Sequence, residues 1–351
     1  MIDHETLIEC FQIAERKRTE RRRFMKMAGT AMAATAGASL LAACDNDDDD
    51  KNPGPVTGTP PPTTSLPAGD VDVLNFALNL EYLEANYYTF AAFGTGVNAQ
   101  NISGTGTQGA VVGGRQVTFS DAMIAANTRE IAADENAHVL FLRQNLGSSA
   151  VAQPAINIDG GATGAFTAAA RAAGIVGPTG TFDPYANDDN FLLGAMLLSD
   201  VGVTAYKGSA TLIANKTVLE AAAGILAVEA YHTGLIRTLL YRRGIPGTTI
   251  ASAQNNRNYA ELISNARDTL DGNITSAGPP ARFADDDQGI GPVTANGGVQ
   301  SNITPTDANA VIFGRTADDV LNVVYQNAGA ATSGGFFPAG LNGNIRASTA
   351  G

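Results

Sequence analysis

The chain has 351 residues, of which 44% are apolar and 16% are charged, and its formal net charge is -12. The charge is uneven: residues 1–44 carry seven Lys and Arg against five Asp and Glu, whereas the remainder carries 15 against 29. No basic surface is therefore predicted after residue 44, which argues against nucleic acid as a partner. The length is sufficient for one sizeable core.

The first 44 residues have the features of an export signal. Arg21 and Arg22 stand before Arg23-Phe24-Met25-Lys26, a pattern that resembles the twin-arginine signal. A weakly apolar, Ala-rich stretch follows over residues 27–43, and it is too short for a convincing membrane span. It ends in Leu41-Ala42-Ala43-Cys44, which resembles the lipobox at which a signal is cleaved and the cysteine is acylated.

We therefore expect export by the twin-arginine machinery and a membrane-anchored lipoprotein of the cell envelope or periplasm, with its lipid on Cys44. Neither Cys10 nor Cys44 indicates a structural disulfide, because both belong to this segment. Residues 45–69 are rich in Asp, Pro, Thr and Gly, and are expected to form a solvated linker.

Four helices of bundle length are predicted next, so the expected fold class is all-α, with the bundle over residues 70–245. Apolar residues recur at helical spacing over residues 71–94, 120–145, 190–215 and 217–243. Asp70 is expected to cap the first helix and Ser120 the second, while Gly147 and Gly244 are expected to end the second and fourth.

The connections differ in length. A Gly-rich, hairpin-like excursion over residues 98–118 is expected to decorate one end of the bundle. Residues 148–189 lie between the second and third helices, which is the position of the crossover in a bundle with one long crossover.

In the extension over residues 246–351, which is expected to pack on the bundle, short helices are predicted at 258–270 and 317–328. The run Asp285-Asp286-Asp287 favours a solvated loop over a cation site.

Two tetrads carry the predicted chemistry, Glu135-Asn136-Ala137-His138 in the second helix and Glu229-Ala230-Tyr231-His232 in the fourth. Residues three apart share a helix face, so each tetrad directs a carboxylate and an imidazole to one place. After Cys44 the chain has only these two histidines, and both have Glu three positions earlier. Both tetrads lie among apolar residues, where an unpaired carboxylate is costly and a metal removes that cost.

The first and third helices are expected to complete the site. In the first, Glu81 and Glu84 share a face with Tyr88. We prefer Glu81 as the ligand and keep Glu84 as an alternative or as a neighbour of the ligands. Tyr88 is either a hydrogen-bond partner of the site or a core tyrosine. In the third, Asp200 is the only acid; we favour it as a ligand, the alternative being that it accepts the ring N–H of a ligating histidine.

The chain resembles the bacterial ferritin-like domain family that includes desiccation-related proteins. The resemblance rests on residues 75–84, 200–206 and 224–232, and on the tail Ser333-Gly334-Gly335-Phe336-Phe337-Pro338. It implies a ferritin-like bundle with a long crossover and two metal ions. The spacing of Glu81 and Tyr88 is similar to that in the first helices of rubrerythrin-like proteins and ferritins. Members of the family tend to have Glu-Asp where this chain has Ser199-Asp200.

Two metal ions, iron preferred and manganese possible, favour an oxidoreductase of the ferroxidase or peroxide-handling type. The rival interpretation is a non-catalytic protein of the envelope that protects against desiccation or stress and has a structural or vestigial metal site. A metal store comes third. An open coordination position would favour catalysis over a structural role. No motif for an organic substrate is visible, and the sequence leaves an oligomer open.

Overall fold

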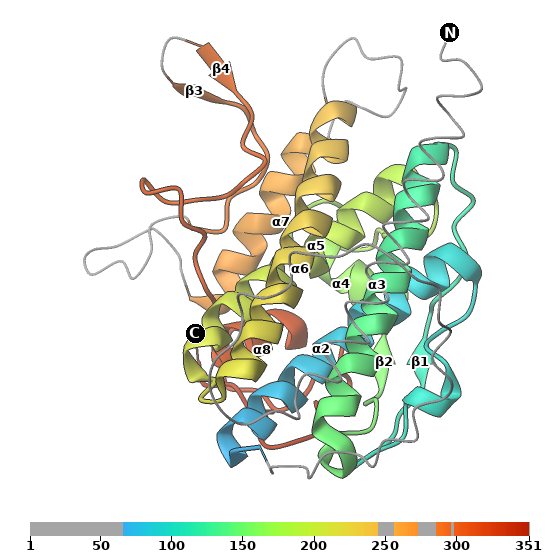
Figure 1. Ribbon diagram of the computed structural model, residues 1–351. Coiled ribbons are helices and arrows are strands. Elements are labelled where there is room, and N and C mark those ends of the chain that lie inside the picture. The colour runs from blue at the N-terminus through green and yellow to red at the C-terminus, as the bar shows by residue number, and fades with distance from the viewer. Residues whose placement is uncertain (1–65, 245–255, 273–285, 296–297, 351) are drawn as a thin grey trace, which may run out of the picture. The chain divides into compact units, whose positions relative to one another are not determined.

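Four long helices dominate the structure, a computed structural model that describes residues 66–244, 256–272, 286–295 and 298–350 (Figure 1). They are α2 (Ala68–Phe93), α3 (Ala122–Leu146), α5 (Asp188–Ser209) and α6 (Lys216–Arg243). The predicted all-α bundle is confirmed. Arg21, Arg22, Cys44 and the predicted linker up to residue 65 lie outside the described residues. Within the described ranges, no helix has the length and apolar character needed to cross a membrane.

The helix directions follow from contacts between helix starts. The carboxylate of Asp70, in the first turn of α2, accepts hydrogen bonds from the backbone N–H groups of residues 214–215, just before α6, at 2.8 and 2.9 Å. Asp188, the first residue of α5, accepts the N–H groups of residues 120–121, just before α3, at 2.9 and 3.0 Å. Helices α2 and α6 thus start at one end of the bundle, and α3 and α5 start together as well.

These contacts correct two predicted caps. Asp70 does not cap α2, since the residue before that helix is Pro67 and the Asp70 carboxylate is bound at the start of α6. The cap of α3 is Asp121 rather than Ser120, whose hydroxyl donates to Asp188. Predicted ends at Gly147 and Gly244 match the structure.

The third predicted helix ends early. Helix α5 stops at Ser209 and passes into the 3-10 turn Ala210–Leu212. Asn215 instead caps α6, because its side chain accepts the N–H groups of residues 217 and 218.

Residues 98–118 do not form the expected hairpin. They contain the 3-10 turn Ala99–Asn101 and strand β1 (Val111–Val112), which pairs in parallel with β2 (Ile156–Asn157) of the crossover. A bridge between Thr105 and Val151 extends the pairing. The crossover also holds the 3-10 turn Gly147–Ser149 and helix α4 (Ala165–Ala172). The two long connections therefore support each other along the bundle.

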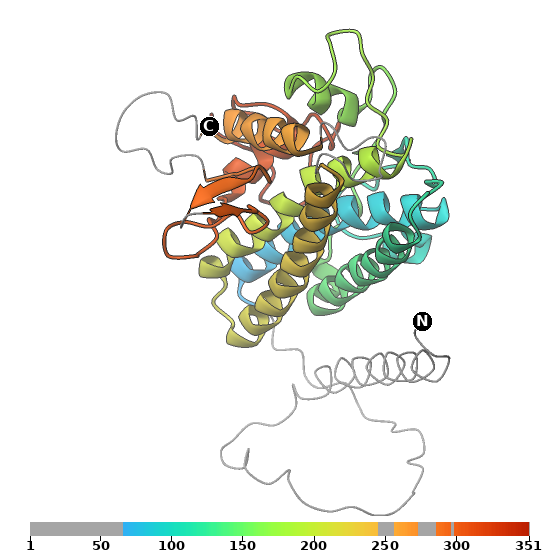
Figure 2. The same ribbon diagram turned by 90° about the horizontal axis from the view of Figure 1, so that it is seen from above.

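The C-terminal part contains α7 (Asn256–Asp271), β3 (Val293–Ala295), β4 (Gly298–Gln300) and α8 (Ala317–Tyr325). Strands β3 and β4 form an antiparallel pair. Helices α7 and α8 contact α5, and α7 also contacts α6. Figure 2 shows α7 and the β3–β4 pair on the side of the bundle away from α3.

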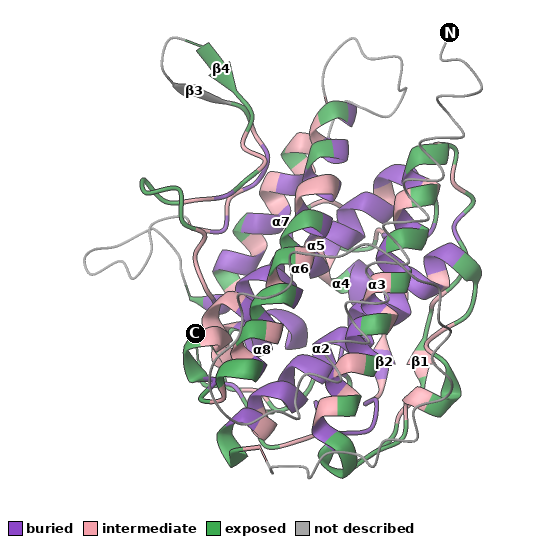
Figure 3. Ribbon diagram, in the orientation of Figure 1, coloured by how far each residue is buried: buried purple, intermediate pink, exposed green. Residues whose placement is uncertain are grey.

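Burial is greatest in the first and third bundle helices. Helix α2 is buried almost throughout, and α5 is buried from Asp188 to Tyr206 except at Asn190 and Leu197 (Figure 3). Helices α3 and α6 each keep one solvated face. Because α2 and α5 have little solvated surface, polar residues on them need partners inside the protein.

Candidate metal centre

Six polar side chains converge in the interior of the bundle, and we call them the Glu–His cluster. Helix α2 contributes two carboxylates, while α3 and α6 each contribute a carboxylate and an imidazole. None is more than 8% exposed. The members are Glu81, Glu84, Glu135, His138, Glu229 and His232.

One half of the cluster is arranged around His138. Its Nδ1 atom lies 3.3 Å from Glu81 Oε2, 3.3 Å from Glu229 Oε1 and 3.7 Å from Glu135 Oε2. One ligand atom from each of these four residues can be chosen so that all lie within 4.8 Å of one another. Such a spacing is compatible with a single ion bound by mixed carboxylate and imidazole ligands.

The other half is arranged around His232. Its Nδ1 atom lies 3.1 Å from Glu135 Oε1, so Glu135 contacts one histidine with each of its oxygens. The centroids of the two imidazole rings are 6.4 Å apart. Antiparallel packing thus brings the two histidines to one level of the bundle, as their positions in the tetrads predict. A carboxylate in this position can bridge two ions.

His232 has a further partner that the sequence did not indicate. Its Nε2 atom lies 3.2 Å from Asp134 Oδ2, and the Asp134 side chain is 38% exposed. A proton held on Nε2 by this carboxylate leaves Nδ1 directed at Glu135. The contact therefore fixes the orientation of the imidazole that a metal ligand needs.

Hydroxyl groups hold the two carboxylates of α2. Tyr206 donates a short hydrogen bond to Glu81 Oε1. Ser199 donates to Glu84 Oε2 at 3.0 Å, and because its single proton is used there, the 2.7 Å contact with Tyr88 is donated by the tyrosine. Tyr88 therefore acts on the cluster through Ser199.

Helix α5 makes room for Glu84 with a glycine. A Cβ atom on Gly202 would lie 2.6 Å from Glu84 Oε1 and 3.4 Å from Glu229 Oε2. The first distance is shorter than van der Waals contact allows, so a larger residue would displace Glu84. Serine at 199 and glycine at 202 thus allow α2 to supply two carboxylates to the cluster.

The electrostatics show an excess of negative charge. Burial raises the pKa of Glu81 to about 8, although His138 opposes this shift, and burial beside Glu229 and Glu135 raises the pKa of Glu84. Burial also acts against ionisation of Glu135, yet its close contacts with the imidazoles of His138 and His232 lower its pKa to about 2. Four carboxyl groups face two imidazoles, so the cluster is negative when all four are ionised, even beside two imidazolium ions.

Several atoms of the cluster also lack hydrogen bonds. Among the described residues, no hydrogen-bond partner is found for either oxygen of Glu135, for one oxygen each of Glu81 and Glu229, or for Nδ1 of either histidine. These buried atoms face each other, and leaving them unpaired is costly. Two divalent cations would bind them and neutralise four carboxylates, so the residues present fit such ions.

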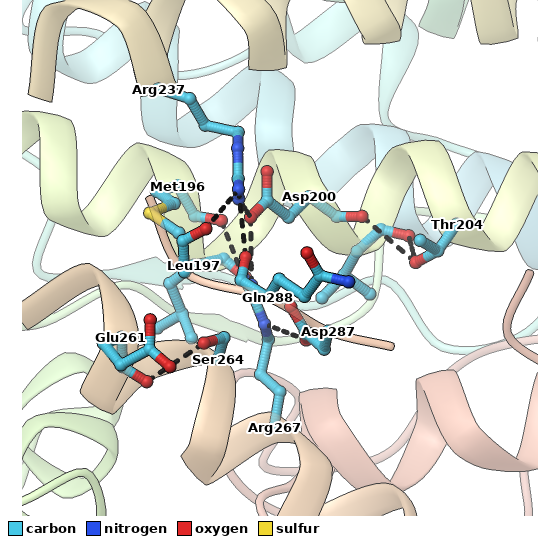
Figure 4. Close-up of polar contacts among 12 residues, drawn as sticks. Met196, Leu197, Asp200, Thr204, Arg237, Glu261, Ser264, Arg267, Asp287 and Gln288 are labelled. Carbon is cyan, nitrogen blue, oxygen red and sulfur yellow. Dashed lines mark hydrogen bonds and ion pairs between the residues drawn. The ribbon is translucent and has the colours of Figure 1, made fainter. Parts of the chain in front are cut away.

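The structure does not bring Asp200 into the Glu–His cluster. Its Oδ2 atom accepts hydrogen bonds from Arg237 and Arg267, both at 2.9 Å (Figure 4). The two guanidinium groups already compensate its charge, so the expected ligand role is replaced by a buried ion pair. The expected contact with a ligating histidine is made by Asp134 instead.

Asp200 belongs to a second group of charged residues, which we call the arginine cluster. Asp287 binds both Arg267, at 2.6 Å, and Arg315, at 2.5 Å, and Asp271 binds Arg315 at 2.9 Å. Its members are Asp200, Arg237, Arg267, Asp271, Asp287 and Arg315. Asp287 is 2% exposed, so the prediction of a solvated loop is wrong at this residue; Asp285 lies outside the described residues.

Known proteins resemble this chain over the same region. The family model described as a ferritin-like domain matches residues 69–242. Desiccation-related protein PCC13-62 of Craterostigma plantagineum is 28% identical over 262 residues, 73% of this chain and 77% of that protein. Ferritin-like catalase Nec2 of Nesocodon mauritianus is 25% identical over 291 residues, 81% of this chain and 86% of that protein. No solved structure matches significantly. The chain therefore contains a ferritin-like domain over residues 69–242 and is homologous to desiccation-related and ferritin-like catalase proteins.

Proposed function

We propose that the Glu–His cluster binds two divalent metal ions, iron preferred and manganese possible, and that the protein disproportionates hydrogen peroxide. The observation that carries this proposal is the buried set of unpaired carboxylate oxygens and Nδ1 atoms that face each other with a negative charge excess. The similarity to a ferritin-like catalase supports the choice of peroxide as substrate.

The ligands divide between the two positions. Glu81, Glu135, His138 and Glu229 would hold one ion, and Glu135, Glu229, Glu84 and His232 the other. When bound, the ions supply reversible changes of oxidation state that pass electrons between two peroxide molecules. In the overall reaction, one hydrogen peroxide loses two electrons and two protons to become dioxygen, and a second takes up both to give two molecules of water.

The surrounding residues position the ligands and hold protons. Tyr206 orients Glu81, and Ser199 with Tyr88 orients Glu84. Because burial beside Glu229 and Glu135 raises the pKa of Glu84, this carboxyl group readily holds a proton in the metal-free cluster, and a bound ion would displace that proton. Asp134 keeps the proton of His232 on Nε2 and is itself in contact with solvent.

The experiment is metal analysis of the purified full chain, followed by measurement of dioxygen release from hydrogen peroxide. Glu229→Gln removes one ligand and should lower both metal content and dioxygen release, since Glu229 Oε1 lies 3.3 Å from His138 Nδ1. Glu220→Gln changes an exposed residue of the same helix and should leave both unchanged. Metal content that is equal in the wild type and Glu229→Gln would refute the site.

A ferroxidase and a non-catalytic protective protein are the alternatives, and the desiccation-related relative favours the second. A ferroxidase would oxidise added ferrous iron faster than it releases dioxygen from peroxide. A protein with a structural metal would contain the ions, lose stability on chelation and be inert towards both reagents.

We further propose that the chain is exported by the twin-arginine machinery and anchored to a membrane of the cell envelope by a lipid on Cys44. The support is the order of Arg21, Arg22, the Ala-rich stretch and Leu41-Ala42-Ala43-Cys44. Labelling with radioactive palmitate tests this: Cys44→Ser should abolish the label and release the protein from the membrane fraction. Replacement of Arg21 and Arg22 by Lys should keep it in the cytoplasm.

A further inference from the structure

An apolar cavity of about 190 Å³ lies among α4, α5, α7 and α8. Helix α4 lines it with alanines, and two of them, Ala168 and Ala172, are exposed, so the cavity reaches the surface beside α4. Leu197 of α5, Val323 of α8 and Phe336 of the C-terminal tail contribute to its wall.

A second cavity, of about 20 Å³, lies closer to the Glu–His cluster. It shares Leu197, Val323 and Phe336 with the larger cavity, and its other walls include Glu84 and Gly202. Its volume is comparable with the space that one water-sized molecule occupies. The three shared side chains line both cavities, so the two cavities adjoin, one beside the surface at α4 and the other beside Glu84.

The polar side chains in the walls of the larger cavity are already bound. Arg267 donates to Asp287, to Asp200 and to the carbonyl of Met196. Gln326 donates its amide N–H to the carbonyl of Ala165. A cavity with such walls gives water few partners and favours a small apolar molecule.

Exposed polar residues lie on a different side of the cluster. Asp134 is 38% exposed and contacts His232, whose neighbour Tyr231 is 79% exposed. These residues lie on α3 and α6, whereas the two cavities lie on the side of α5 that faces α4 and α8. The cluster therefore has a polar side and an apolar side.

We propose that the two cavities form a channel through which dioxygen moves between the cluster and the surface at α4. The identity of the gas rests on the proposed function, in which dioxygen is the product and hydrogen peroxide is the polar reactant. Peroxide would enter on the side of Asp134, and dioxygen would leave past Glu84, Leu197 and Val323. The separation would keep the product away from the entry of the reactant.

The channel can be tested without metal or catalysis. Crystals of the metal-free full chain, pressurised with xenon, should show xenon in both cavities. Dissolved dioxygen should enhance the NMR relaxation of the methyl groups of Leu80, Leu83 and Val323 more than that of methyl groups elsewhere in the core, such as those of Leu142. Absence of xenon from the smaller cavity, together with equal relaxation enhancements, would overturn the channel.

Two variants connect the channel with turnover. Ala169→Phe fills the larger cavity and Leu197→Phe blocks the passage between the two, whereas Ala126→Phe adds the same side chain to an exposed position of α3. In the metal-loaded protein, the first two should lower kcat for dioxygen release severalfold with little change in KM for peroxide. The third should change neither.

The outcomes separate the channel from the proposed function. Xenon excluded by Leu197→Phe with kcat unchanged would overturn the channel and leave the peroxide chemistry standing. Gas in both cavities of a metal-loaded protein that consumes no peroxide would support the channel and overturn the proposed function. Displacement of xenon by a long alkane such as decane would overturn the channel and indicate a lipid site.

Discussion

The Glu–His cluster and the arginine cluster are both buried and highly charged, and both have members on α6, yet they balance their charge differently. In the arginine cluster, three guanidinium groups face three carboxylates at 2.5 to 2.9 Å. In the Glu–His cluster, four carboxylates face two imidazoles, and both oxygens of Glu135 lack hydrogen bonds.

This difference separates buried charges that hold the fold together from buried charges that we propose bind metal. Guanidinium groups are permanently charged and bind carboxylates in a fixed geometry, so the arginine cluster balances the charge of its three carboxylates within the chain. It joins α5 and α6 to α7, to residues 287–289 and to Arg315. In the proposed function, cations from outside complete the Glu–His cluster. Its cost in the metal-free protein is the expected consequence of a site built to bind metal.

The largest effect is expected for Glu135→Gln. Glu135 contacts both histidines, at 3.7 and 3.1 Å, so its removal should empty both metal positions and abolish dioxygen release. The fold should persist, because the arginine cluster does not depend on metal. Elemental analysis and circular dichroism measure the two properties. Glu130→Gln, an exposed change on the same helix, is the control. Retention of one metal equivalent would show that Glu135 does not bridge.

Arg267→Met should lower stability and leave metal binding unchanged, the reverse of the result expected for Glu135→Gln. It leaves Asp200 and Asp287 buried with fewer partners, which should reduce the free energy of unfolding by about 3–5 kcal/mol. Metal content per folded molecule should not change. Urea unfolding and metal analysis test the pair of statements, with the exposed Arg129→Met as control. Loss of metal without loss of stability would show that the two clusters are not independent.

The sequence predicted the Glu–His cluster better than the arginine cluster, and the reason is the distance between partners along the chain. Each tetrad holds two ligands three residues apart, so helical periodicity alone places them together. Asp200, in contrast, meets Arg237 and Arg267, which lie 37 and 67 residues further on. No local pattern encodes such contacts, and Asp200 therefore resembled a ligand.

Other features could not be predicted from the sequence, because they are too short to form a pattern or depend on how two helices pack. Strands β1 and β2 have two residues each, too few for an alternating pattern to be detected. Glu84 enters the cluster because position 202 is glycine, which only the packing of α5 on α2 explains. Asp134 directly precedes the tetrad of α3, and its contact with His232 depends on how α3 and α6 face each other.

The stability of the metal-free protein should depend on pH, because the Glu–His cluster contains carboxyl and imidazole groups with shifted pKa values. Burial raises the pKa of Glu81 to about 8, and Asp134 and Glu135 raise that of His232 to about 10 against the effect of burial. The folded chain then keeps protons that the unfolded chain releases near pH 4.5 and 6.5. The stabilising contribution of each group is therefore lost as the pH rises, between about pH 4.5 and 8 for Glu81 and between about pH 6.5 and 10 for His232, by about 1.4 kcal/mol per pH unit for each group.

Urea unfolding from pH 5 to pH 10 measures this slope. Burial also raises the pKa of Asp268, near the arginine cluster, to about 8, so the series should be repeated in Asp268→Asn to remove that contribution. Saturation with metal should flatten the curve, because bound ions displace the protons. A metal-free protein whose stability rises over this range would contradict the assigned charge excess.

The smallest effect is expected at the edge of the Glu–His cluster, for Asp134→Asn. The amide can no longer accept the Nε2 proton with a charged oxygen, so the imidazole of His232 is held less well and its Nδ1 atom is a weaker ligand. Metal affinity should fall about 10- to 100-fold, the range found for such neighbours of metal ligands. Stability of the metal-free protein should change little, because the Asp134 side chain is 38% exposed.

Competition with a chromophoric chelator measures the metal affinity of Asp134→Asn, and Glu130→Gln controls for loss of surface charge. An unchanged affinity would mean that His232 is oriented by packing alone, and the distinction between the two clusters would then lie wholly within their buried residues.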